Sequence, residues 1–78
     1  MKEILYVIAT RGKNGNEIYL MIDEERGKLN PYKVYFKWTN NIENAYADFN
    51  GYDIEKFAKG YFKNYNKWYI TCYKAKFE

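Results

Sequence analysis

The chain has 78 residues, a net charge of +3 and an aromatic content of 22%. This length predicts one domain over residues 1–78. Because Cys72 is the only cysteine, the composition excludes a disulfide framework within the chain and a thiolate metal cluster. Its place in an apolar segment indicates a small core filler. All of the +3 charge lies in residues 52–78, and it is too small to indicate a dedicated binder of duplex DNA.

The first half of the chain predicts three strands. Residues 3–10 are β-branched, aromatic and aliphatic, and residues 17–23 alternate aliphatic side chains with others. The loop between them, 11–16, is rich in Gly and Asn and predicts a hairpin. The charged segment 24–31 is expected to be a connecting turn that ends in proline. The strict alternation of residues 32–39 predicts the third strand.

The segment 40–51 is less regular than its neighbours. Asn40 and Glu43 have the spacing of a weak capping box, so we expect a short helical turn or an irregular loop here. Ala45 and Phe49 are expected to point inward from this segment.

The second half contains one clear helix and one more strand. Residues 52–66 predict the helix, and Asp53 is expected to cap it. Its apolar side chains recur at helical spacing and form one stripe: Ile54, Phe57, Ala58, Tyr61, Phe62 and Tyr65. Residues 67–77 alternate again and predict the last strand.

The order β-β-β-α-β predicts an α+β fold, a two-layer sandwich. A four-stranded, mainly antiparallel sheet would have the single helix on one face. Besides the helix stripe, the predicted core consists of Ile18, Leu20, Ile22, Val34, Phe36, Trp38, Trp68, Ile70 and Cys72. The first strand points either Leu5 and Val7 or Ile4, Tyr6 and Ile8 inward, and we favour the second set.

The opposite face of the predicted sheet is unusual because it carries rings and cations where an uncovered face is ordinarily polar. Besides Met21, it holds the candidate partner-binding residues Tyr19, Lys33, Tyr35, Lys37, Tyr69, Thr71 and Tyr73. Three interpretations stay open. The side chains stabilise the sheet by cross-strand pairing, they bind a protein or a second copy of the chain, or they stack the bases of a single-stranded nucleic acid.

The sequence gives little support for catalysis, so we expect neither an enzyme nor a bound cofactor or metal. There is no histidine. The carboxylates of Asp23, Glu24 and Glu25 are interpreted as a solvated turn rather than a metal site. The loop 11–16 leads into a strand, so no helix N-terminus is available there for a phosphate. The N-terminal apolar run is too short for a signal or a membrane span, so we expect a cytoplasmic protein without membrane partners.

The stretch "KWTNNIENAYADFNGYDIEKFAKGYF" combines a strand end at Trp38-Thr39, an Ala45…Phe49 step and a helix of the "IEKFAK" type. In this it resembles small early-region accessory proteins of temperate bacteriophages of Gram-positive bacteria. The resemblance covers about residues 32–73. It implies a protein that binds a host or mobile-element protein, such as a defence nuclease, a replication factor or a repressor, and inhibits or modulates it in the host cytoplasm. A single-stranded nucleic-acid binder and a structural homodimer are the alternatives.

Overall fold

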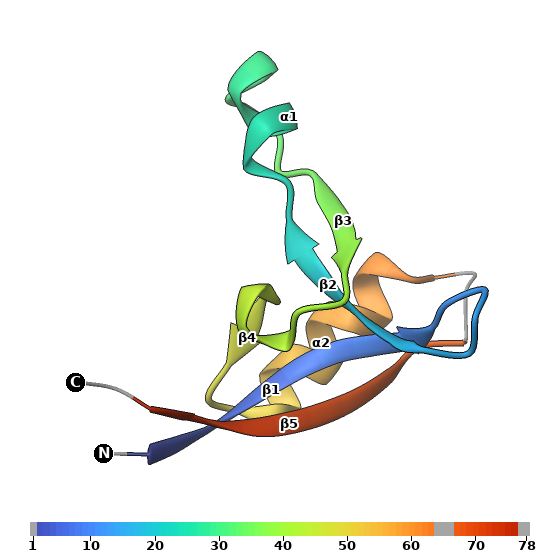
Figure 1. Ribbon diagram of the computed structural model, residues 1–78. Helices are drawn as coiled ribbons and strands as arrows, with labels where there is room; N and C mark the ends of the chain where they lie inside the picture. The colour runs from blue at the N-terminus through green and yellow to red at the C-terminus, as the bar shows by residue number, and fades with distance from the viewer. Residues whose placement is uncertain (1, 64–66, 77–78) are drawn as a thin grey trace.

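The computed structural model of the protein describes residues 2–63 and 67–76 and contains one five-stranded antiparallel sheet with a helix on one face (Figure 1). The predicted α+β class is therefore confirmed. In chain order the elements are β1 (Lys2–Arg11), β2 (Glu17–Ile22), α1 (Glu24–Leu29), β3 (Phe36–Thr39), the 3-10 turn η1 (Ile42–Asn44), β4 (Ala47–Asp48), α2 (Gly51–Tyr61) and β5 (Tyr69–Lys76).

Strand β1 is the centre of the sheet. One of its edges pairs with β5 along residues 2–9. The other edge is shared, because β2 pairs with residues 9–11 and β4 with residues 6–7. Strand β3 extends the sheet outward from β2. Ala9 therefore has a cross-strand neighbour on each side, Tyr19 on β2 and Tyr69 on β5.

The hairpin between β1 and β2 closes as the sequence predicts. The backbone N–H of Gly12 donates to the carbonyl oxygen of Asn16 at 2.8 Å. Gly15 adopts a φ of 77°, in the left-handed region that glycine enters without steric cost.

The core lies between the sheet and α2. Four fully buried side chains form its centre: Ile8, Leu20, Ile54 and Ala58. Six partly buried side chains pack around them: Tyr6, Phe36, Phe57, Phe62, Trp68 and Ile70. Of the favoured inward set of the first strand, Tyr6 and Ile8 pack in this core, whereas Ile4 is 45% exposed. Val7 of the other set is also fully buried, so the strand is covered on both faces at this point.

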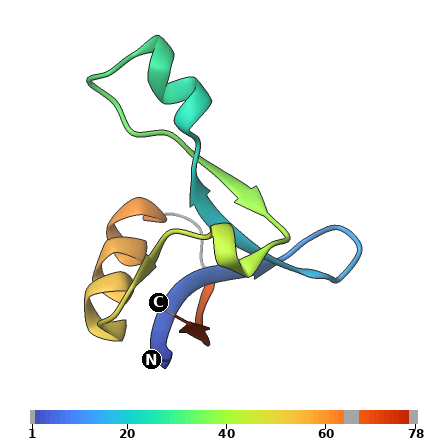
Figure 2. The same cartoon turned by 60° about the vertical axis from the view of Figure 1, so that its left-hand side comes forward.

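Three predictions about residues 22–39 are wrong, because this part of the chain forms an arm that projects from the body (Figures 1 and 2). Segment 24–31 contains helix α1 rather than only a turn. Strand β3 begins at Phe36, four residues later than predicted. Val34 and Ile22, predicted to be core, are 66% and 40% exposed. Helix α2 has 11 residues and is only about 16 Å long, so it covers Phe36 at the base of the arm but not Ile22 and Val34.

Two further core predictions are wrong at the margins of the sheet. Cys72 is exposed, because β5 is an edge strand and α2 does not cover this part of it. Phe49 is 61% exposed, because the chain turns out of β4 towards α2 at this point. Trp38 is 37% exposed, yet its ring stacks on Phe62 at 5.9 Å, so it closes the rim of the core.

The helices and the short turn differ from prediction in their boundaries and caps. Asn50, not Asp53, caps α2, since its side chain accepts the N–H groups of Tyr52 and Asp53. The helical turn expected within 40–51 is η1, where Asn41 is the cap, and the two-residue strand β4 that follows it was not predicted. Helix α2 ends at Tyr61, so it is shorter than the predicted range 52–66. The predicted stripe residue Tyr65 and the last strand residue, Phe77, lie outside the described residues.

Candidate binding surface

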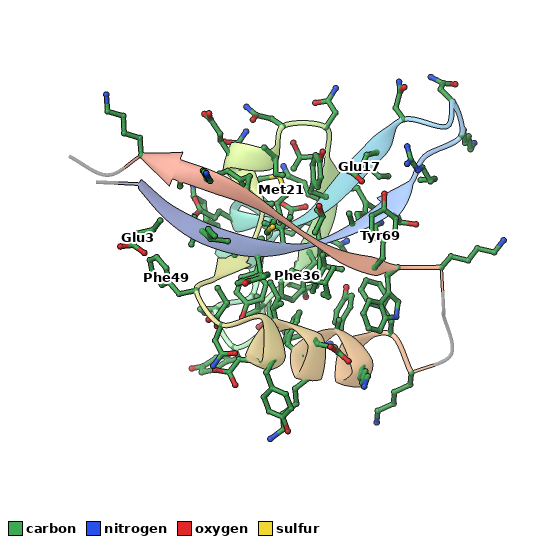
Figure 3. All side chains as sticks on the ribbon, turned by 90° about the horizontal axis from the view of Figure 1, so that it is seen from below. Glu3, Glu17, Met21, Phe36, Phe49 and Tyr69 are labelled. Carbon is green, nitrogen blue, oxygen red and sulfur yellow. The ribbon has the colours of Figure 1, made fainter. Side chains whose placement is uncertain are left out.

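The sheet face away from α2, called the second face here, carries a cluster of two tyrosines around one carboxylate. Ala9 of β1 pairs with Tyr19 of β2 and with Tyr69 of β5, so both rings flank this small side chain. The Tyr19 hydroxyl donates to Oε1 of Glu17 at 2.7 Å, and the Tyr69 hydroxyl donates to Oε2 at 2.5 Å. Figure 3 shows Glu17 and Tyr69 on the side of the sheet opposite α2. The cluster thus links all three strands.

The two hydrogen bonds determine the electrostatics of this cluster. The hydroxyl of Tyr69, followed by that of Tyr19, lowers the pKa of Glu17 below its usual value. The same bonds to Glu17 raise the pKa values of Tyr19 and Tyr69. At neutral pH the cluster is therefore one carboxylate held between two neutral phenols. Glu17 was not among the predicted site residues, because its role depends on the register of three strands.

The predicted residues Thr71 and Tyr73 lie farther along the same face of β5. Tyr73 pairs with Leu5 of β1, and a hollow of about 620 Å³ opens here between β5 and the segment that follows η1. Leu5, Ala47 and Tyr73 are among its lining residues. Glu43 also lines the hollow, so its wall is partly apolar and partly charged, and it lies towards the opposite end of β5 from Tyr69.

The other three predicted residues are on the arm and not in the Glu17 cluster. The guanidinium carbon of Arg26 lies 4.6 Å from the centre of the Tyr35 ring, a cation–π geometry. Lys37 Nζ lies 4.0 Å from Oδ1 of Asp23. Lys33 is exposed and lies outside any strand. The predicted seven-residue surface is thus divided between the sheet and the arm.

The arm also displays three exposed side chains that are not among the predicted partner-binding residues. Leu29 is 87% exposed, Tyr32 is 95% exposed and Val34 is 66% exposed. The only signal for them in the sequence is their position beside Asn30 and Pro31, which interrupt both the helical and the strand pattern.

The backbone of the arm is held by its own hydrogen bonds. The Asp23 side chain caps α1 by accepting the N–H of Arg26 at 3.2 Å. The N–H of Asp23 donates to the Tyr35 carbonyl oxygen at 2.7 Å, which closes the base of the arm. At the tip, Oδ1 of Asn30 accepts the N–H of Tyr32 at 3.2 Å. The exposed apolar side chains are therefore presented from a backbone of defined shape.

No other type of site emerges from the described residues. Within 2–63 and 67–76, no three potential metal-ligating side chains come together. In the same part of the chain, neither α1 nor α2 is long and apolar enough to cross a membrane. A hollow of about 400 Å³ lies at the base of the arm, and Glu24, Glu25 and Lys37 are among its lining residues.

Comparison with known protein families, with curated proteins and with solved structures finds no match for this chain. The candidate surface accordingly rests on the geometry of the molecule.

Proposed function

We propose that the protein is a small non-enzymatic binding module that attaches to a partner protein through its arm. Following the resemblance to phage accessory proteins, we propose that this partner is a host or mobile-element protein that the module inhibits or modulates. The observation that carries the proposal is the exposure of Leu29, Tyr32 and Val34 on one projecting, hydrogen-bonded element. Apolar side chains grouped on a surface indicate a contact with another macromolecule.

The composition of the arm supports a protein partner. A protein interface typically has an apolar centre that includes aromatic rings, surrounded by a polar rim. The tip residues supply such a centre, and the charged residue Lys28 precedes Leu29 in the last turn of α1. Burying one large apolar side chain contributes about 1.5–3 kcal/mol, so a few such residues can dominate the binding energy.

The geometry gives less support to a single-stranded nucleic-acid binder. Such a surface needs rings on which bases stack and cations that hold phosphates. On the second face, the carboxylate of Glu17 lies between the rings of Tyr19 and Tyr69 and would repel phosphate groups. Lys33 and Tyr35 lie on the arm instead, where Arg26 already covers the Tyr35 ring.

The proposal is tested with the double variant Leu29→Ser, Tyr32→Ser. We expect it to fold like the wild type, because both side chains are almost fully exposed, and to lose the partner that immobilised wild-type protein captures from a Gram-positive bacterial lysate. The matched control is Tyr52→Ser, since this tyrosine is 73% exposed but lies on α2, away from the arm. Equal capture of every saturable partner by the arm variant and the control would refute the proposal.

A homodimer makes a different prediction in the same experiment. If the arm binds a second copy, sedimentation of the purified protein gives a doubled mass, and the arm variant restores the monomer. A monomeric wild type that still captures a partner supports the proposed function instead.

A further inference from the structure

Strand β5 has one paired edge and one open edge. Among the residues that the structure describes, β5 pairs only with β1. It is eight residues long and contains neither proline nor glycine. An edge of this length presents a row of backbone N–H and C=O groups that another strand can pair with.

The register determines which backbone groups of β5 point outward. The Gly12 N–H donates to the Asn16 carbonyl oxygen, so these two residues form a hydrogen-bonded pair. Every second residue of β1 before Gly12 therefore also directs its backbone N–H and C=O groups towards β2. The residues of β1 in between therefore direct their backbone N–H and C=O groups towards β5. Ala9 and Leu5 belong to this group, and they pair with Tyr69 and Tyr73. The residues of β5 whose N–H and C=O groups point outward are then Ile70, Cys72, Lys74 and Lys76.

The side chains of these four residues lie on the α2 side of the sheet and change in character along the strand. Ile70 packs against the core, and Cys72 is exposed beside it. Lys74 and Lys76 follow, both exposed. The residue paired with Lys74 is Ile4, which offers no carboxylate, and within the described part of the chain neither lysine forms an ion pair. The open edge is therefore apolar at one end and cationic at the other.

We propose that the open edge of β5 binds an extended, acidic segment of a partner protein as an added antiparallel strand. Directly opposite residues in an antiparallel pair lie on the same face and within side-chain contact. The bound segment would therefore carry acidic residues opposite Lys76 and Lys74, and small or apolar residues opposite Cys72 and Ile70. Read from its N-terminus, its pattern is acid-x-acid-x-apolar-x-apolar.

A second copy of the chain fits this edge less well than an acidic segment does. Strand β5 has two lysines and no acidic residue, so another β5 strand would offer no carboxylate to Lys74 or Lys76. Lysines on edge strands also oppose pairing between identical copies. Charge complementarity accordingly selects an acidic segment from a different protein.

This inference rests on the proposed function only in treating the protein as a protein-binding module, because it concerns a surface separate from the arm. The probe is the synthetic heptapeptide Glu-Thr-Glu-Thr-Val-Thr-Val, acetylated and amidated. We expect saturable binding at low salt, with amide chemical-shift changes in the NMR spectrum centred on Ile70, Cys72 and Lys74. The control peptide with lysine in place of glutamate should bind at least about tenfold more weakly, because it faces like charges.

Two variants distinguish the contribution of the lysine charges to peptide binding from that of the backbone hydrogen bonds. Lys74→Glu with Lys76→Glu should reverse the preference, binding the lysine peptide and losing the glutamate peptide. Cys72→Pro should abolish binding of both, because it removes an outward N–H while leaving the bonds to β1 in place. The arm variant Leu29→Ser with Tyr32→Ser should bind the glutamate peptide like the wild type. The two proposals, partner binding by the arm and strand addition at β5, can therefore fail independently of one another.

Several results would overturn the inference. These are no saturable shift at any β5 amide, equal binding of the two peptides, or unchanged preference in the charge-reversed variant. A doubled mass in sedimentation that Cys72→Pro abolishes, together with no peptide binding, would assign the edge to a second copy instead.

Discussion

The Tyr69 hydroxyl donates to the Glu17 carboxylate at 2.5 Å, across 52 positions of sequence. The bond spans from β5 to β2 over the short side chain of Ala9 on β1. It therefore ties the last strand to the hairpin that carries the arm. Tyr19 and Tyr69, two of the candidate binding residues predicted from sequence, therefore have at least this structural role.

We expect Tyr69→Phe to lower the free energy of unfolding by about 1 kcal/mol, because it removes a hydrogen bond to a charged acceptor at a partly buried site. Urea unfolding followed by tryptophan fluorescence measures the change. Tyr73→Phe is the matched control, since it removes a hydroxyl from the same face of β5 for which no hydrogen bond is found among the described residues. Equal losses in the two variants would show that the bond to Glu17 contributes nothing specific.

The Glu17 cluster should also make stability depend on pH. The folded protein lowers the pKa of Glu17, so the unfolded chain binds more protons around the usual glutamate pKa of about 4.3. The stabilisation from Glu17 is thus complete above that pH and is lost as the pH falls through the lower, folded pKa. We expect Glu17→Gln to be less stable than the wild type at pH 7 and the difference to disappear near pH 2. A difference that stays constant over this range would contradict the linkage.

At alkaline pH the cluster should make stability fall as the pH rises, the opposite direction to the effect of Glu17. The folded protein raises the pKa values of Tyr19 and Tyr69, so their contribution is complete below the usual tyrosine pKa of about 10 and is lost as the pH rises through the folded values. Unfolding measured from pH 8 to 11.5 should show a steeper loss for the wild type than for Tyr19→Phe with Tyr69→Phe. Parallel curves would mean that these tyrosines do not titrate differently on folding.

The sequence was sufficient for the class of the fold because alternation and helical spacing are local signals. They identified the helix stripe and the inward side of β1, where Ile8 is fully buried. Local signals do not reveal how far the covering helix extends, so Val34 and Ile22 were assigned to a core that α2 does not reach. Alternation also gives the face of Cys72 but not the position of β5 at the edge of the sheet.

The candidate surface was predictable only in part, for the same physical reason. That Tyr19 and Tyr69 share a face follows from period-two alternation in two strands. That they meet at Glu17 follows from the pairing of both with Ala9, which is a property of the sheet order. The exposed tip residue Leu29 ends the short helix α1, which has no buried residue, and Tyr32 follows it, so no hydrophobic period identifies this segment.

The difference between core and arm can be measured with two side chains that the sequence assigned alike. Phe36 lies between the sheet and α2, with its ring centre 5.4 Å from that of Phe57 and 5.0 Å from that of Tyr61 (Figure 3). We expect Phe36→Ala to lower the free energy of unfolding by about 3 kcal/mol, because it leaves a cavity among these rings. Val34→Ala should cost less than about 0.5 kcal/mol, since that side chain is 66% exposed. Similar costs for both in urea unfolding would place Val34 in the core after all.

The start of α2 allows a similar comparison of two candidate caps. The Asn50 side chain accepts the N–H of Tyr52 at 2.9 Å and that of Asp53 at 3.4 Å. We expect Asn50→Ala to lower the free energy of unfolding by about 1 kcal/mol, and Asn50→Ser to be nearly neutral because serine caps equally well. Asp53→Asn should lower the free energy of unfolding by less than Asn50→Ala does. This loss should become smaller in high salt, because Asp53 contributes through its interaction with the helix dipole. A salt-independent loss at Asp53 larger than that of Asn50→Ala would instead support the cap predicted from sequence.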